Sequence, residues 1–298
     1  MVTGRRNLQE HGLMGLALVL PAMLVLVAVV LYPLARGIYM SFHNVTFLNL
    51  AQGNHLFVGF QNYLAVFAKP AFWTAVKNSA VWTVANLVFQ MALGLGFALL
   101  LNQPLRGRGM FRSIALIPWI VPSVVAVLTW RWMYDSGNGI LNHWLMRLGV
   151  LDAPVNWLGS VNTVLWSIIA ESVWKGTPFV MVLLLAGLQS IQSELYEAAQ
   201  VDGARNWHIL GLIILPLLKR HLAIAAILTV VYTLNNFNAI WLMTQGGPLH
   251  ASEILVTYAY KTAFQDFNLG QASAIAVIIF IFLSLVATLY ISVVERGE

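Results

Sequence analysis

The chain has 298 residues, of which 59% are hydrophobic and only 9% charged, and its formal net charge is +5. This composition excludes an ordinary soluble globular protein and indicates one integral membrane domain. Cysteine is absent, which excludes disulfides, thiolate metal sites and catalytic thiols. The basic excess does not imply nucleic acid as a partner, because the cytoplasmic loops of membrane proteins collect Lys and Arg.

Long apolar runs predict six transmembrane helices, each near the ~20 residues that a bilayer requires. In chain order the predicted helices cover residues 12–35, 78–105, 113–130, 153–193, 222–248 and 268–294. The predicted fold class is therefore all-α: a polytopic membrane protein with one six-helix domain over 13–294 and short tails at 1–12 and 295–298. Arg5 and Arg6 before the first run also suit a secretory or twin-arginine signal. The run is too long for one and lacks a small-residue cleavage site, so a membrane anchor is expected.

The distribution of basic residues predicts the orientation. If both termini are cytoplasmic, the short inside segments hold nine of the sixteen basic residues. The longer outside loops, about 36–77, 131–160 and 249–266, hold only six. The positive-inside rule therefore places both termini on the cytoplasmic side.

The segment after the fourth run has a different pattern. Ile191, Leu195 and Ala199 recur at intervals of four, which gives a short helix one apolar face, while Glu194 and Glu197 project elsewhere.

The ends of this short helix are also marked. Ser193 is placed to cap its start, and Gly203 permits the left-handed residue that ends it. A second short helix is expected over 204–211, at an angle to the first. Such a helix-turn-helix can enter a groove on another protein. It can equally lie on the headgroups or pack on its own bundle, and amphipathicity alone does not choose between these placements.

The fourth run carries charge and helix-breaking residues together. Glu171 and Lys175 lie one turn apart and are followed by Gly176 and Pro178, with Trp174 beside them. Ionisable groups inside a membrane usually face a cavity or a partner, and a broken helix is tolerated only where its freed backbone groups are satisfied. Glu171, Trp174 and Lys175 are therefore candidates for a substrate pathway. The alternative is a buried structural Glu171–Lys175 pair.

The fifth run contains a cluster of amides. Asn235, Asn236 and Asn238 interrupt an apolar stretch, and Tyr232 and Trp241 lie nearby. Amides both donate to and accept from sugar hydroxyls, so these residues are candidates for a polar pathway. Hydrogen bonding between helices is the rival explanation.

The residues around Glu197 carry a specific motif, within a loop that covers 190–216. Glu197-Ala198-Ala199 precede Asp202-Gly203-Ala204 and Leu215-Pro216. This string resembles the EAA loop of permease subunits of binding-protein-dependent ABC importers. Further stretches resemble the carbohydrate-import group of that family: 59–63, 106–109, 130–132, 174–175, 186–188 and 244–248.

The resemblance implies a transmembrane permease subunit of an ATP-driven importer in the bacterial inner membrane, forming half of a pathway for a sugar or sugar derivative. It implies four further chains: a second homologous permease subunit, two ATPase subunits that dock on the EAA loop, and an external solute-binding protein. ATP and Mg²⁺ are expected on the ATPase subunits, with no cofactor and no metal on this chain. Sugar contacts in the family include the fifth helix, which favours a pathway role for its asparagines.

An outside loop follows the fifth run. Gly246-Gly247-Pro248 predicts a projecting turn, and Gln245 and His250 flank it. These residues are expected to contact the solute-binding protein.

The sequence lacks the motifs of an enzyme. It has no phosphate-binding loop ending in Gly-Lys-Ser or Gly-Lys-Thr, no HExxH or similar metal spacing and no GxSxG. Two other classes stay open: an autonomous proton-coupled secondary transporter that uses Glu171, and a membrane structural protein. An ABC permease is inert without its ATPase, whereas a proton-coupled carrier transports alone and responds to a pH gradient.

Overall fold

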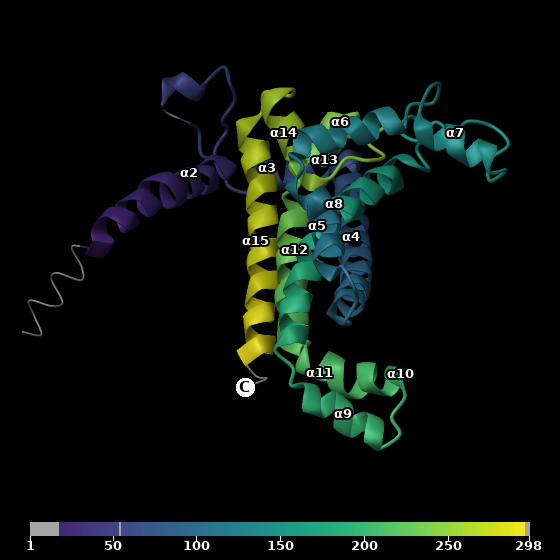
Figure 1. Ribbon diagram of the computed structural model, residues 1–298. Helices are drawn as coiled ribbons and strands as arrows, with labels where there is room; N and C mark the ends of the chain where they lie inside the picture. Colours follow the sequence, from purple (N-terminus) through teal and green to yellow (C-terminus); the bar gives the residue numbers. More distant parts are fainter. Residues whose placement is uncertain (1–17, 54, 296–298) are drawn as a thin grey trace, which may run out of the picture. The chain divides into compact units, whose positions relative to one another are not determined.

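The computed structural model describes residues 18–53 and 55–295, which are predominantly helical (Figure 1). The chain divides into two compact units. The first comprises the chain up to Ala68 together with Ala259–Ile278. The second comprises Lys69–Tyr258 together with the residues from Ile279 onward. The all-α fold class predicted from the sequence is confirmed.

The first unit begins with an apolar helix that runs from Leu18 to Ser41. Asn62 fixes the turn that follows this helix, because its amide donates hydrogen bonds to the backbone carbonyls of Ser41, at 2.9 Å, and His43, at 3.0 Å. The sequence stretch at 59–63 therefore has a structural role. The elements are the π turn η1 (Val27–Leu31), α2 (Tyr32–Ser41), the 3₁₀ turn η2 (Leu50–Gln52) and α3 (Gln61–Phe67).

The second unit contains the elements from α4 to α13. They are α4 (Pro70–Asn102), α5 (Arg108–Ile120), α6 (Ser123–Met133), α7 (Ile140–Arg147), α8 (Val164–Gln189), α9 (Ser193–Val201), α10 (Asn206–Ile209), the π turn η3 (Leu210–Ile214), α11 (Leu215–Leu217), α12 (Lys219–Leu234) and α13 (Phe237–Thr244). Two more helices, α14 (Leu255–Phe264) and α15 (Leu269–Glu295), have residues in both units.

Helix α8 is the central element of the second unit. It packs along α4 and also contacts α5 and α12 (Figure 1). One apolar cluster joins α8 to α4 and α13 and includes Trp82, Ile168 and Ile240. Another, nearer the α9–α11 segment, includes Leu184 and Leu218. Burial of these side chains holds α8 against several helices at once, so its polar residues face other elements rather than lipid alone.

Five helices among the described residues are long and apolar enough to cross a membrane, and α5 with α6 makes a sixth if the bent pair is one span. The predicted boundaries were inexact: α4 starts at Pro70 rather than 78, and α8 starts at Val164 rather than 153. The start of the first predicted span, the tail at 1–12 and residues 296–298 lie outside the described residues.

The prediction of one uninterrupted helix over 113–130 is wrong. Helices α5 and α6 are bent by 91° at a short break. Val121 has an extended ψ of 130°, as expected for a residue that precedes a proline, and Pro122 has no N–H to continue the helix.

The predicted interruption of the fourth span is also wrong, because α8 continues through Gly176 and Pro178. The break occurs instead in the fifth run, where α12 ends and α13 begins. Asn235 is the C-cap residue of α12, and Asn236 caps α13 by accepting a hydrogen bond from the backbone N–H of Ala239 at 3.3 Å. Pro178 is tolerated inside α8 because, in a membrane helix, neighbouring helices can satisfy the backbone groups that a proline leaves free.

Candidate functional site

A polar pocket of about 250 Å³ lies between α4, α8, α12 and the break that separates α5 from α6. Hydroxyl, amide and ammonium groups share its wall with aromatic rings. The lining residues are Gln90, Trp119, Ser172, Lys175, Gly176, Phe179, Thr229, Tyr232, Thr233 and Asn236.

One wall of this polar pocket comes from α12 and the break that follows it. Thr229 and Thr233 are four residues apart, the spacing that brings side chains onto one side of a helix, and Asn236 follows just after the end of α12 at Leu234. The Thr229 hydroxyl is buried and has no hydrogen-bond partner among the described residues. A buried hydroxyl without a partner is costly, so this wall is suited to a ligand or water that supplies one.

The opposite wall is built by α4 and α8. The buried Gln90 amide donates hydrogen bonds to Asn86 Oδ1, at 2.9 Å, and to the backbone carbonyl of Ser172, at 3.3 Å. Any side chain at Gly176 would collide with this amide. Gly176 is therefore a packing requirement that lets Gln90 reach the pocket.

Lys175 and Glu171 have different surroundings although they lie one turn apart. The Lys175 ammonium donates to the backbone carbonyl of Val121 at 2.6 Å, and the carbonyl of Pro118 lies 3.5 Å away. Glu171 is only 1% exposed, and neither carboxylate oxygen has a hydrogen-bond partner among the described residues. No hydrogen bond or ion pair between these two side chains is found in the described part of the chain, so the alternative of a directly bonded structural pair does not form.

Three aromatic rings follow one another along the polar pocket. The centroid of Trp119 lies 6.1 Å from that of Phe179, which in turn lies 6.0 Å from Tyr232 in an edge-on arrangement. Rings and hydrogen-bonding groups thus alternate on the same small surface.

Only some of the predicted pathway residues come together here. Lys175, Tyr232 and Asn236 line the polar pocket, whereas Asn235 and Asn238 are exposed elsewhere. The Asn235 amide donates to the carbonyl of Val231 at 2.9 Å.

The other predicted pathway residues lie away from this pocket. Trp241 stacks on Phe237 with ring centroids 5.2 Å apart. Trp174 lines the apolar groove described below, and Glu171 lines neither space. Sequence reasoning missed Gln90, Trp119, Ser172, Gly176, Phe179, Thr229 and Thr233. The helical spacing of Thr229 and Thr233 was the signal available for α12.

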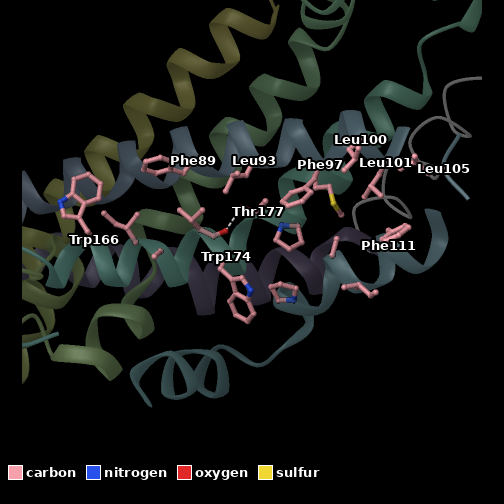
Figure 2. Close-up of a pocket in the computed structure, with 18 of the residues that line it drawn as sticks. Phe89, Leu93, Phe97, Leu100, Leu101, Leu105, Phe111, Trp166, Trp174 and Thr177 are labelled. Atoms are coloured by element: carbon pink, nitrogen blue, oxygen red, sulfur yellow. Dashed lines mark hydrogen bonds between the residues drawn. The ribbon is translucent and has the colours of Figure 1, made fainter. Parts of the chain in front are cut away.

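A larger, apolar groove of about 980 Å³ lies between α4, α5 and α8. Figure 2 shows Phe89, Leu93 and Phe97 along one side, Trp166 at one end and Phe111 toward the other. Its lining is mainly aromatic and aliphatic, with Arg106 and Thr177 among its few polar side chains.

The predicted helix-turn-helix is present after α8. Helix α9 ends in a turn at Gly203, whose φ of 80° is left-handed as expected. The second helix was misplaced: it begins at Asn206 and continues through η3 and α11 to Leu217, rather than covering 204–211. The predicted cap is also wrong, because Ser193 is already helical and the N-cap residue is Gln192.

Residues 190–216, the predicted coupling loop, have two distinct faces. Tyr196, Ala199 and Ala204 pack inward on the apolar cluster around Leu218, and burial raises the pKa of the Tyr196 hydroxyl. The outer face carries most of the motif. Its exposed residues are Glu197, Ala198, Asp202, Gly203 and Pro216, and Leu215 is half-buried.

Large apolar side chains accompany the outer face of the coupling loop. Val201, Trp207 and Leu212 are between 64% and 88% exposed. Exposed apolar groups gathered on one segment outside the spans are typical of a protein interaction surface.

The outer loop after α13 is held in a defined conformation. The Asn78 amide of α4 donates to the backbone carbonyls of His250, at 2.9 Å, and Glu253, at 3.0 Å. The His250 ring also bonds the buried carboxylate of Glu253. Leu249 and His250 form the exposed tip with left-handed φ values.

The predicted contact residues of this loop differ in accessibility. Gln245 is exposed, Gly246 is buried, and Gly247 and Pro248 are half-buried. The accessible part of the loop is therefore centred on its tip rather than on the glycine pair.

Residues 90–297 match the family described as binding-protein-dependent transport system inner membrane component, and the chain belongs to this family. It is a permease component of such a system, as predicted, and the family places it in an inner membrane. The chain is 38% identical to the trehalose/maltose transport system permease protein MalF of Thermococcus litoralis, covering 98% of this chain and 97% of the relative. It is 34% identical to the sulfoquinovosyl glycerol transport system permease protein SmoG of Agrobacterium fabrum, covering 96% and 92%.

The fold has a solved counterpart. A chain of a bacterial ABC transporter involved in the import of the acidic polysaccharide alginate superposes with a TM-score of 0.83 at 21% identity, covering 98% of both chains. The predicted permease fold is thereby confirmed.

Proposed function

We propose that this chain forms half of the translocation pathway of an ATP-driven importer for a sugar or sugar derivative. The observation that carries the proposal is the polar pocket. Sugar hydroxyls both donate and accept hydrogen bonds, and Thr229, Asn236 and Gln90 offer hydroxyl and amide groups of both kinds. The apolar faces of a sugar ring suit the rings of Trp119 and Phe179.

The relatives agree with this chemistry. Two homologues that align over nearly the whole chain are named for the transport of trehalose or maltose and of sulfoquinovosyl glycerol. Their substrates differ, which is consistent with a pocket of general carbohydrate character. Which sugar this chain passes is expected to depend mainly on the external binding protein.

The proposed assembly has four further chains. A second homologous permease subunit completes the pathway, and an external solute-binding protein delivers the sugar to the outer loop around His250. Two ATPase subunits, which carry ATP and Mg²⁺, bind the coupling loop through Glu197 and the exposed apolar side chains near it. This arrangement places both termini and the coupling loop in the cytoplasm.

Reconstitution tests the proposal. The chain is expressed with its partner subunits in vesicles, and uptake of labelled trehalose, maltose and a monosaccharide panel is measured. We expect uptake only with ATP inside and the loaded binding protein outside.

The rival classes give different results in the same experiment. Uptake by the chain alone, driven by a pH gradient and abolished by Glu171→Gln, would establish the proton-coupled carrier. Absence of any sugar-dependent response in the fully assembled complex would contradict the sugar importer.

A further inference from the structure

The break that separates α5 from α6 leaves backbone carbonyls without their helical donors. In an α-helix the carbonyl of Pro118 would accept from the N–H four residues later, but that residue is Pro122, which has no N–H. Val121 leaves the helix with an extended ψ, so its carbonyl also points away from the α5 ladder. Unsatisfied carbonyls inside a membrane cost free energy, and a nearby donor is needed.

Lys175 of α8 is the donor that reaches this break. Its ammonium lies 2.6 Å from the carbonyl oxygen of Val121 and 3.5 Å from that of Pro118. A cation is also favourable where helix carbonyls end. The two carbonyls bracket Trp119 in the sequence, so the position of the break decides the position of this ring.

Trp119 is part of the polar pocket. Its ring lies in the wall that also includes Lys175, and it contacts Phe179 of the same helix as Lys175. Movement of the break would therefore move an aromatic wall of the pocket.

We propose that Lys175 is a positioning residue: by binding the carbonyls of Pro118 and Val121 it holds the α5–α6 break and thereby sets Trp119 against the sugar. The proposal rests on the sugar-transport function proposed above. It assigns Lys175 an indirect action, through the backbone of the break, rather than a contact with the sugar.

The first test needs no sugar. Because the chain has no cysteine, Trp119→Cys introduces a single thiol, and its reaction rate with a water-soluble maleimide is measured in the purified complex. Adding Lys175→Met should change that rate at least fivefold, whereas Lys175→Arg, which keeps the donor, should not. Tyr232→Cys, on the α12 wall, is the matched control and should react equally in both backgrounds. An unchanged rate at position 119 overturns the proposal, even if sugar uptake is normal.

The second test is a double-mutant cycle on uptake of labelled trehalose or maltose by the complete complex. Lys175→Met should raise the uptake KM roughly tenfold in the natural background, because a misplaced Trp119 loses an aromatic contact with the sugar worth about this much. In a Trp119→Ala background the same substitution should have almost no further effect, because residues that act through one another are not additive. The control is Trp166→Phe, on α8 like Lys175 but outside the polar pocket, and it should leave the uptake KM unchanged.

The outcomes separate this proposal from the function on which it rests. An undiminished effect of Lys175→Met in the Trp119→Ala background would mean that Lys175 contacts the sugar itself, and would overturn the positioning role. A wild-type complex that transports no sugar would contradict the proposed function, while the thiol reaction at position 119 would still decide the role of Lys175.

Discussion

Asn236 has two roles in this structure, and they can be separated by substitution. Its side-chain oxygen caps α13, and the residue also lines the polar pocket. Serine keeps an oxygen for the cap but removes the amide that a sugar can use. Asn238, two residues later, is exposed and does not line the pocket.

Asn236→Ser should therefore raise the uptake KM about threefold to tenfold, the effect of one neutral hydrogen bond, with little change in the thermal stability of the complex. Asn238→Ser is the control and should change neither quantity. Uptake kinetics and thermal unfolding of the same preparations check this. Equal loss of uptake in both variants would exclude a specific contact at position 236.

At the scale of the helices, the close approach of α4 to α8 beside Val180 depends on Gly94. A Cβ at Gly94 would lie 2.6 Å from the Val180 side chain and 3.2 Å from the backbone nitrogen of Met181, whereas a Cβ at Gly96 would meet nothing within 4 Å. These two glycines lie on the same helix, so they form a matched pair.

Gly94→Ala should destabilise the protein by about 1–3 kcal/mol, because the backbone at Met181 cannot yield to the added methyl group without shifting α8. Gly96→Ala should be neutral or stabilising by up to ~1 kcal/mol, because alanine loses less conformational entropy. Thermal unfolding in detergent measures both. A Gly94 variant as stable as the Gly96 variant would mean that the helices pack less closely than described.

The coupling loop is an element whose two faces predict different effects. Inward residues such as Tyr196 hold it to the bundle, and outward residues such as Glu197 are free to meet a partner. Glu197→Lys should leave the permease folded in the membrane but lower sugar-stimulated ATP hydrolysis by about fivefold or more. Glu194→Lys, an exposed charge reversal on the same helix outside the motif, is the control. Normal stimulation in the Glu197 variant would contradict docking at this face.

At the scale of the whole molecule, the outer loop and the coupling loop are expected on opposite sides of the membrane. His250→Cys should crosslink to the external binding protein when a sugar is bound to it, and the absence of other cysteines makes the result specific. Asp202→Cys, in the coupling loop, should crosslink only to an ATPase subunit. Mass spectrometry of the crosslinked products identifies the partner at each position. Crosslinking of position 250 to an ATPase would reverse the proposed orientation.

Much about this protein can be predicted from its sequence because the relevant signals are local. A bilayer requires about 20 apolar residues per helix, so the apolar runs alone indicate a polytopic membrane protein. The motif from Glu197 to Pro216 indicates the permease family, and Gly203 marks the turn between two short helices through its backbone freedom. None of these inferences requires knowledge of which helices touch.

The tertiary structure decided the features that depend on neighbouring helices. Hydropathy describes one helix at a time, so it cannot tell that Pro178 is accommodated within α8 while Pro122 accompanies a 91° bend. The polar pocket joins Gln90 of α4, Trp119 of α5 and Thr229 of α12, which are far apart in the sequence. The hydrogen bond from Lys175 to Val121 likewise exists only because α8 packs beside the break. Helix packing determines which polar groups meet. The packing depends on how closely the side chains of different helices fit together, which the order of residues along the chain does not show directly.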